Sequence, residues 1–436
     1  MATISENLLA LQQAKTDIKT AIESKGQDLT NVPFTEYHVK IVDIQTGGGG
    51  TEGVELILPE AFATVSIIYN VKVDNNKILL SANITNIGVW LYDLTDNSCV
   101  QLYNQGHNWV YFQEVKNGWL ITSNNNKVVG VLFYNTSTNT ITQVYTTGYN
   151  WNNFKIVGNN CLISSNGSYS LGILAYNSTN NTITQIHTTG YNWGKYFAVV
   201  GDECVLASDN SSSLGLLVYN STNNTITQIR EDGYYWAYLT AVGDVCLIAS
   251  SNSSFVGVYI YNSTDKTFVQ AYEIGYRWGE IYQLVGNDCL LCTTSSSYGT
   301  GILVYNGTTK TITLEYSTGA NWKYFHLIAD KCLISSGSSN TGILRYNGAD
   351  KTISQIQTRY YNWQYSVVIG DYLLLGMSSG GYGVMVYNQS QDTITWAYTS
   401  GQQWQNFSPI GNNCLISSTS SSSSNGVCSL MLKQAL

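Results

Sequence analysis

The chain has 436 residues, of which 44% are hydrophobic and only 11% are charged. A typical soluble domain is roughly a quarter charged, and here Tyr, Trp, Gly and uncharged polar residues take the place of that charge. The aromatic content argues against disorder. A net charge of -8 argues against a nucleic-acid-binding surface. No apolar stretch is long enough for a membrane helix, and no secretory signal pattern opens the chain.

Residues 1–46 predict a small helical module. Thr3 to Glu6 forms a capping-box pattern, and Gly26 stands at a C-cap position. Apolar residues fall between them at helical spacing: Ile4, Leu8, Leu11, Ile18 and Ile22. A second, shorter helix is predicted to start at Pro33. Helices of this size bury little surface alone, so we expect either an oligomerising coiled-coil seam or a hairpin lying on the rest of the protein.

This segment resembles the N-terminal module of tail and fibre proteins from phages of Gram-positive hosts. That module reads K-x-x-I-K-x-A-I-x-x-K-G, then F-x-x-Y-x-x-K-I and a Gly-rich linker. The matching residues are Lys15, Ile18, Lys19, Ala21, Ile22, Lys25, Gly26, Phe34, Tyr37, Lys40 and Ile41. The resemblance covers about a tenth of the chain. It implies a virion protein that is anchored by this module, forms a trimer or larger assembly, and carries a variable C-terminal part that often meets the host.

Residues 47–53 form a Gly-rich hinge, and residues 54–436 contain a repeat of 41–44 residues. Eight tryptophans mark the repeat: Trp109, Trp151, Trp193, Trp236, Trp278, Trp322, Trp363 and Trp404. Six Cys and seven Tyr-Asn pairs keep the same spacing. Each unit holds four short β-branched runs separated by Gly, Asn, Asp and Ser, which is typical of a four-stranded antiparallel β-propeller blade.

The predicted fold is therefore an all-β propeller of about nine blades, following the helical module. The count falls to eight if the first unit, which lacks the marker Trp, is not a blade. The last unit has only three predicted strands. We expect Val54–Leu58 to supply its fourth strand and to close the ring, since closure removes exposed sheet edges.

No residue pattern predicts an enzyme, a metal site or a cofactor. The repeated Cys lies on the second strand of each unit and is interpreted as a small core side chain. Cys289 and Cys292 form a single CxxC in one strand, without the second pair of a zinc site. The acidic residues are scattered and mostly occupy hairpin turns, as Asp202, Asp244 and Asp371 do.

One end of the blades is predicted to gather the G-Y-N-W segments and the Ser-rich loops. Aromatic rings and uncharged polar groups suit the faces and hydroxyls of sugars. The candidate glycan-binding residues are Trp109, Tyr149, Trp151, Tyr191, Trp193, Tyr234, Trp236, Tyr276, Trp278, Trp322, Tyr361, Trp363 and Trp404. The alternative is that the repeated Trp fills the space between adjacent blades.

These observations lead to the hypothesis of a phage virion protein of the tail-fibre or receptor-binding type. Its expected partners are other virion proteins, further copies of itself and a host-surface glycan, without nucleic acid or membrane insertion. The expected location is the virion, after synthesis in the host cytoplasm. The alternative is a purely structural tail, collar or baseplate component whose propeller binds other virion proteins, and a glycan-degrading enzyme ranks third.

Overall fold

The computed structural model describes six residues between 15 and 23 and most of the repeat region. The described ranges there are 68–82, 88–105, 108–124, 130–148, 150–165, 172–189, 193–208, 215–231, 235–252, 257–294, 301–318, 321–337, 342–358, 362–377, 383–399, 404–411, 413–418 and 427–431.

The six described N-terminal residues, Lys15, Thr16, Ile18, Lys19, Thr20 and Glu23, are α-helical. Lys19 and Glu23 form an ion pair at 3.6 Å, one helical turn apart. Ile18 is 40% exposed, so this apolar residue of the predicted seam is uncovered in the single chain. Its predicted companions Ile4, Leu8, Leu11 and Ile22 lie outside the described residues, as do the hinge 47–53 and Val54–Leu58.

Nine antiparallel sheets follow the helical residues, eight of four strands and one of three. The first four sheets are β1 (Ile68–Lys72), β2 (Lys77–Ala82), β3 (Val89–Asp93), β4 (Ser98–Tyr103); β5 (Trp109–Val115), β6 (Gly118–Ser123), β7 (Val131–Asn135), β8 (Thr140–Tyr145); β9 (Trp151–Val157), β10 (Asn160–Ser165), β11 (Ile173–Asn177), β12 (Thr182–His187); and β13 (Trp193–Val200), β14 (Glu203–Ser208), β15 (Leu216–Asn220), β16 (Thr225–Arg230).

The other five sheets are β17 (Trp236–Val242), β18 (Val245–Ser250), β19 (Val258–Asn262), β20 (Thr267–Tyr272); β21 (Ile281–Val285), β22 (Asp288–Cys292), β23 (Ile302–Asn306), β24 (Thr311–Tyr316); β25 (Trp322–Ile328), β26 (Lys331–Ser336), β27 (Ile343–Asn347), β28 (Thr352–Gln357); β29 (Trp363–Ile369), β30 (Tyr372–Met377), β31 (Val384–Asn388), β32 (Thr393–Tyr398); and β33 (Trp404–Ile410), β34 (Asn413–Ser418), β35 (Val427–Met431).

Each sheet is a meander whose tight turns follow from its polar residues. In the third sheet, Gly158 turns β9 into β10 with a φ of 58°. Asn177 begins the turn into β12 by accepting the N–H of Thr179 at 2.8 Å, and Asn181 completes it with a φ of 57°. Asn and Gly tolerate this left-handed backbone better than other residues. The prediction that Gly, Asn, Asp and Ser separate the strands of each unit is confirmed here.

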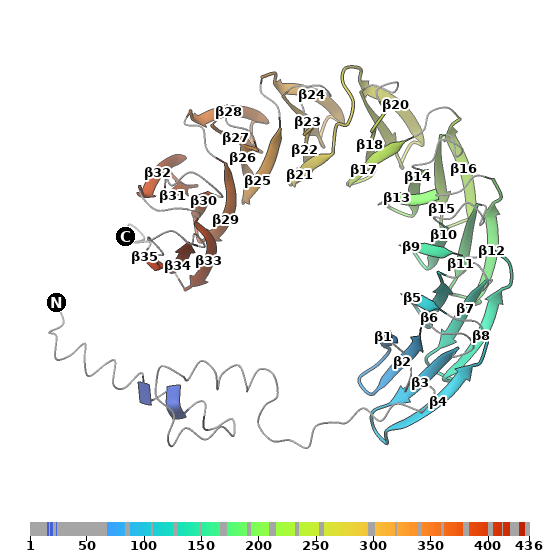
Figure 1. The fold of residues 1–436 in the computed structure, drawn as a ribbon. Helices are drawn as coiled ribbons and strands as arrows, with labels where there is room; N and C mark the ends of the chain where they lie inside the picture. The colour runs from blue at the N-terminus through green and yellow to red at the C-terminus, as the bar shows by residue number, and fades with distance from the viewer. Residues whose placement is uncertain are drawn as a thin grey trace.

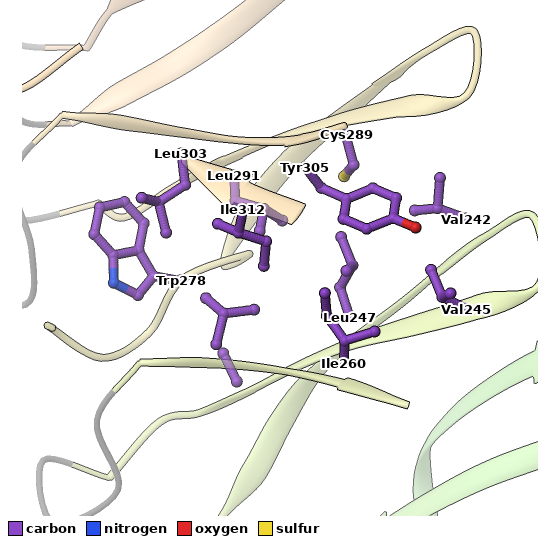
Figure 2. Packing of buried hydrophobic residues seen from close by; sticks show 12 residues of the cluster. Val242, Val245, Leu247, Ile260, Trp278, Cys289, Leu291, Leu303, Tyr305 and Ile312 are labelled. Atoms are coloured by element: carbon purple, nitrogen blue, oxygen red, sulfur yellow. The ribbon is translucent and has the colours of Figure 1, made fainter. Parts of the chain in front are cut away.

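The core is divided into layers between neighbouring sheets. We call the side of a sheet that carries its Trp the Trp face, and the other side the forward face. In the third sheet, Trp151 and Cys161 lie on the Trp face and pack on the second sheet, whereas Val157 and Leu162 pack on the fourth. Figure 2 shows one such junction, where Trp278 faces the fifth sheet. Both faces of an inner sheet are buried, which explains why β10 is buried along its whole length.

The sheets follow one another along an arc, with the first strand of each on the inner side and the fourth strand on the outer side (Figure 1). The nine-blade prediction is therefore confirmed, and the unit without the marker Trp forms a complete four-stranded sheet, β1–β4. The predicted closed ring is not what the structure shows, because the first and last sheets stand apart at the two ends of the arc (Figure 1). The last sheet has three described strands.

Candidate recognition surface

The eight marker tryptophans do not form a surface. Their side chains are 0–2% exposed, so the packing alternative is the one that the structure shows. The glycan-contact hypothesis is therefore wrong for Trp109, Trp151, Trp193, Trp236, Trp278, Trp322, Trp363 and Trp404. The tryptophans recur at regular spacing because each junction between two blades has the same gap, which a large ring fills.

The contacts of these rings explain why Trp is used. The ring of Trp151 meets the ring of Tyr145, from the outer strand of the preceding sheet, edge to face at 6.0 Å between centroids. Its indole N–H donates to the carbonyl of Thr147 at 3.3 Å. The indole N–H groups of Trp109, Trp193 and Trp278 donate to a backbone carbonyl four residues earlier in the same way. A marker Trp can also be held through its backbone carbonyl: at the junction of the seventh and eighth sheets, the buried Ser335 hydroxyl donates to Trp363 O at 2.7 Å.

The residue before the Trp makes backbone hydrogen bonds to its own sheet or to the preceding one. Arg277 donates its N–H to Ser250 O of the preceding sheet at 2.9 Å, and Tyr235 accepts the N–H of Ser251 in its own sheet at 2.8 Å. This position is left-handed in several units, with φ of 56° at Asn108, 60° at Tyr235 and 61° at Arg277. Asn suits that conformation, whereas a bulky residue there is strained by about 1–3 kcal/mol. Tyr235 and Arg277 thus replace the Asn of other units at a position that disfavours bulky side chains.

The described part of this end of the blades gathers exposed side chains at the junction of the fifth and sixth sheets. Ile274 is 70% exposed and Tyr235 39%. Arg277 lies 4.0 Å from the carboxylate of Glu280, which accepts the Thr294 hydroxyl at 2.7 Å. We call Tyr235, Ile274, Tyr276, Arg277 and Glu280 the loop patch.

Of the five tyrosines predicted to bind glycan, one lies within the residues that the structure describes. Tyr276 is half-buried within the loop patch. The other candidates lie outside the described residues: Tyr149, Tyr191, Tyr234 and Tyr361. Most of the Ser-rich loops lie outside them as well. The structure thus brings one predicted aromatic residue to an exposed patch, together with Tyr235 and Arg277, which the Asn-based pattern did not single out.

The cysteines are core residues in the described sheets. Eight are free thiols, seven of them buried. Burial raises the pKa of the Cys161 thiol to about 12, so the thiol is protonated at neutral pH. Within the described ranges, no group of three or more His, Cys, Asp and Glu could hold a metal ion. No described helix is long and apolar enough to cross a membrane.

The turn carboxylates and the buried His are also structural. Asp244 accepts the Thr264 hydroxyl at 3.0 Å and the Lys310 ammonium at 2.5 Å, and the hydrogen bond from Lys310 is the main reason that its pKa is lowered. His326 lies 3.0 Å from Trp363 O and 2.8 Å from the Ser366 hydroxyl. Burial lowers the pKa of His326 to about 4, so the imidazole is neutral at pH 7.

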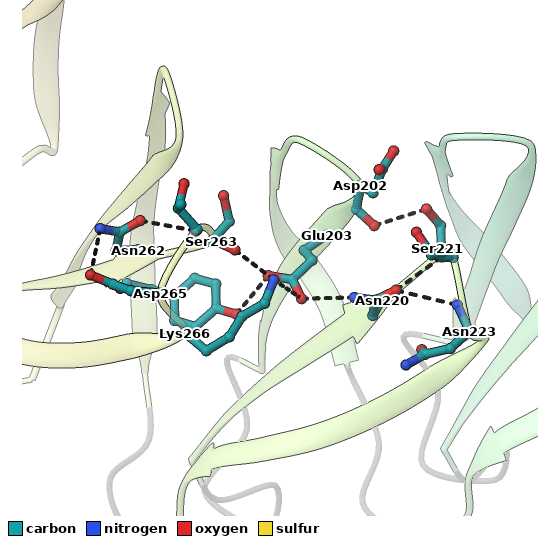
Figure 3. A network of polar contacts seen from close by, with 12 residues as sticks. Asp202, Glu203, Asn220, Ser221, Asn223, Asn262, Ser263, Asp265 and Lys266 are labelled. Carbon is teal, nitrogen blue, oxygen red and sulfur yellow. Dashed lines mark hydrogen bonds and ion pairs between the residues drawn. The ribbon is translucent and has the colours of Figure 1, made fainter.

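A polar cluster missed by the sequence reasoning lies between the fourth and fifth sheets (Figure 3). The carboxylate of Glu203, only 4% exposed, accepts the Lys266 ammonium at 2.7 Å, the Asn220 amide at 3.0 Å and the Tyr261 hydroxyl at 2.6 Å. A cavity of about 280 Å³ opens beside it. We call this cavity the Glu203 pocket.

The sequence does carry a signal for this pocket. Glu203 stands where the third unit has Asn160, and Lys266 stands where earlier turns have Asn139, Asn181 and Asn224. Lys266 has a φ of 61°, in the left-handed region that Asn fills elsewhere. An acidic and a basic departure from the repeat meet across this junction, as Asp288 and Lys351 do across the junction of the sixth and seventh sheets. The sequence alone does not show that Glu203 and Lys266 meet, because they lie 63 positions apart on different sheets.

Comparison with known proteins adds no family. No protein-family model and no curated protein matches the chain. Similar solved structures include apo AztD from Citrobacter koseri, with 10% identity and a TM-score of 0.34 over 77% of this chain and 97% of that one. BamB from Moraxella catarrhalis has 14% identity and a TM-score of 0.34 over 70% and 92%. Tricorn protease has 11% identity and a TM-score of 0.28 over 81% of this chain but only 46% of its own length. At these values no role is transferred from them.

Proposed function

We propose that the chain is a phage virion protein of the tail-fibre or receptor-binding type. Its N-terminal helices attach it to the particle, and the loop end of its blades recognises glycans on the host surface. The observation that carries the recognition role is the contrast between fixed and varied positions. The Trp is the same in eight units and buried, whereas the residue before it changes to Tyr235 and Arg277 where exposed side chains gather.

The chemistry of the loop end favours a neutral, hydroxyl-rich ligand. Within the loop patch, the charges of Arg277 and Glu280 face one another, so no isolated charge demands an ionic partner. The exposed ring of Tyr235 and the side chain of Ile274 offer apolar contact. Sugars combine apolar C–H faces with hydroxyls and suit such a surface. Similar loops on nine blades would multiply weak single contacts by avidity.

The attachment role rests on the N-terminal resemblance and on Ile18. Ile18 belongs to the predicted apolar seam, and burying that seam against another protein chain would remove its apolar surface from water. We propose that these helices bind other virion proteins or further copies of the same chain. The product is then located in the virion, and binding proceeds without bond cleavage in the ligand.

The test combines location with adsorption. Gold-labelled antibodies against the full-length protein should mark an exposed part of the particle, such as the tail tip. Added full-length protein should slow adsorption of the particles to host cells by competing for the receptor. Particles that carry no label would contradict the virion role. Normal adsorption in a saturating excess of the protein would contradict the recognition role. Release of reducing ends from cell-wall polysaccharide would contradict the non-enzymatic assignment.

One observation favours the structural alternative, in which the blades bind other virion proteins. On the forward face of the last sheet, Ile410 is 64% and Leu415 40% exposed. Exposed apolar side chains on a sheet face favour a protein partner over a glycan. In that case the label would lie at an internal joint of the particle, and the added protein would leave adsorption unchanged.

A further inference from the structure

The Glu203 pocket lies at the turn end of the blades, opposite the loop patch. The strand register places the lining residues of the pocket on one face of the sheet. Glu203 pairs with Asn220, which pairs with Thr225. Two residues further along the same strands, Val218 pairs with Thr227. This is the forward face of the fourth sheet. The fifth sheet closes the pocket with Tyr261 and Lys266.

The buried carboxylate organises the pocket without being available to a charged ligand. Its oxygens already accept three donors, and the Lys266 ammonium balances its charge. The three N–H donors of that ammonium are not all used by protein, since Glu203 and the Ser263 carbonyl, at 2.5 Å, take two. The Lys266 side chain is 54% exposed, so the remaining donor reaches the opening.

The rim adds neutral hydrogen-bonding groups and an apolar wall. Asn223 lines the pocket and accepts the Thr225 hydroxyl with its Oδ1 at 2.6 Å, so its amide NH₂ group takes no part in that bond. Thr227 presents an exposed hydroxyl, and Val218 with Ile229 lines the pocket with methyl groups. Pockets for drug-sized ligands hold roughly 300–1,000 Å³, so this one fits a smaller molecule.

We infer that the Glu203 pocket binds a single uncharged sugar residue, and so provides a glycan subsite distinct from the loop patch. The ligand hydroxyls pair with Lys266, Asn223 and Thr227, while an apolar edge such as an N-acetyl methyl contacts Val218 and Ile229. An anionic group is disfavoured, because the only cation of the pocket is already neutralised by Glu203.

Titration calorimetry and saturation-transfer NMR on the full-length protein test this inference, with N-acetylglucosamine, glucose and glycerol phosphate as separate probes. We expect one or both sugars to bind and to slow amide exchange in β16, and glycerol phosphate to show neither effect. Thr227→Val keeps the shape and β-propensity of the exposed residue but removes its hydroxyl. It should weaken sugar binding about fivefold, the effect of one neutral hydrogen bond.

The third sheet supplies the matched control. Thr184 occupies the position of Thr227 in the same T-I-T-Q-I strand, at a junction that has Asn160 in place of Glu203. Thr184→Val should leave binding unchanged. Equal weakening by both variants, binding of glycerol phosphate in preference to the sugars, or no binding of either sugar would overturn the inference. Because the pocket and the loop patch lie at opposite ends of the blades, failure here leaves the adsorption result untouched.

Discussion

Two sheets of similar sequence show what a neighbouring blade contributes. On the forward face of the sixth sheet, Val285 and Leu290 are 2% and 0% exposed because the seventh sheet covers them. On the forward face of the ninth, Ile410 and Leu415 occupy the matching positions and are 64% and 40% exposed. Both positions are aliphatic in the two sheets, so burial comes from the neighbour and not from the sheet itself.

This difference implies that the stability of each sheet depends on the number of neighbouring sheets it packs against, as expected for repeats that contact only their neighbours. A substitution in an inner junction should affect two sheets. The same substitution at the end of the arc should affect one or none. Local hydrogen exchange is the suitable readout, because a long array need not unfold in one step.

The largest expected effect is the loss of a marker tryptophan. Trp278→Ala removes the ring that fills the junction of the fifth and sixth sheets and should destabilise both by about 3–5 kcal/mol. Trp404→Ala should in the same way destabilise the eighth and ninth sheets, because its ring packs against Ile369, Leu374 and Val386 of the eighth sheet. Hydrogen exchange by mass spectrometry should show two adjacent sheets opening in the first variant. Opening confined to the sixth sheet would contradict the shared-junction account.

Leucine truncation gives a direct test of the two forward faces. Leu290→Ala should destabilise its junction by about 2–5 kcal/mol, because it leaves a buried cavity. Leu415→Ala should change the stability of the last sheet by less than about 1 kcal/mol, since its side chain is already in contact with water. Denaturant titrations followed by exchange in β22 and β34 measure the two values. Equal losses would mean that a partner covers the last sheet in solution.

The stability of the junction between the seventh and eighth sheets should depend on pH, whereas the stability of the last sheet should not. The pKa of His326 is lowered by burial from 6.5 to about 4 in the folded protein, so the unfolded chain binds the extra proton first. Stability at this junction should therefore fall as pH drops from about 6.5 towards 4, by roughly 3 kcal/mol in all. The last sheet has Ser408 at this strand position and should show no such change.

The control for this titration is His326→Gln. Its amide can still donate to the Trp363 carbonyl, the interaction that His326 makes now, but it cannot ionise. The pH dependence of exchange in β25 and β29 should become flat in this variant. A slope that persists unchanged would assign the effect to another group.

The smallest expected effect concerns backbone strain in the loop patch. Tyr235→Asn places the residue used by other units in the same left-handed conformation and should stabilise the fifth sheet by about 1 kcal/mol. Asn108→Gly is the comparison, since Asn and Gly both accept this backbone and little should change. A destabilised Tyr235→Asn protein would show that the Tyr ring stabilises the fold.

The repeat made the architecture predictable, because period, turn residues and β-branched runs all specify one four-stranded unit. The open arc was not predictable in the same way. The angle between two neighbouring sheets depends on how all the side chains of one face pack against those of the next sheet. The sequence left the role of the tryptophans open, because a residue repeated in every unit is expected both for core packing and for a repeated binding site. The loop patch and the Glu203 pocket arise where single units depart from the pattern, and Glu203 meets Lys266 only after the neighbouring sheets are packed.

The most direct test of the recognition account is surface plasmon resonance of the full-length protein on immobilised, purified cell-wall polysaccharide from the host. The wild-type protein should bind saturably, and a Tyr235→Asn, Arg277→Asn double variant, restored to the common residue of the repeat, should bind at least about fivefold more weakly while remaining folded. Equal binding by the two proteins, or no binding by the wild type, would contradict the account.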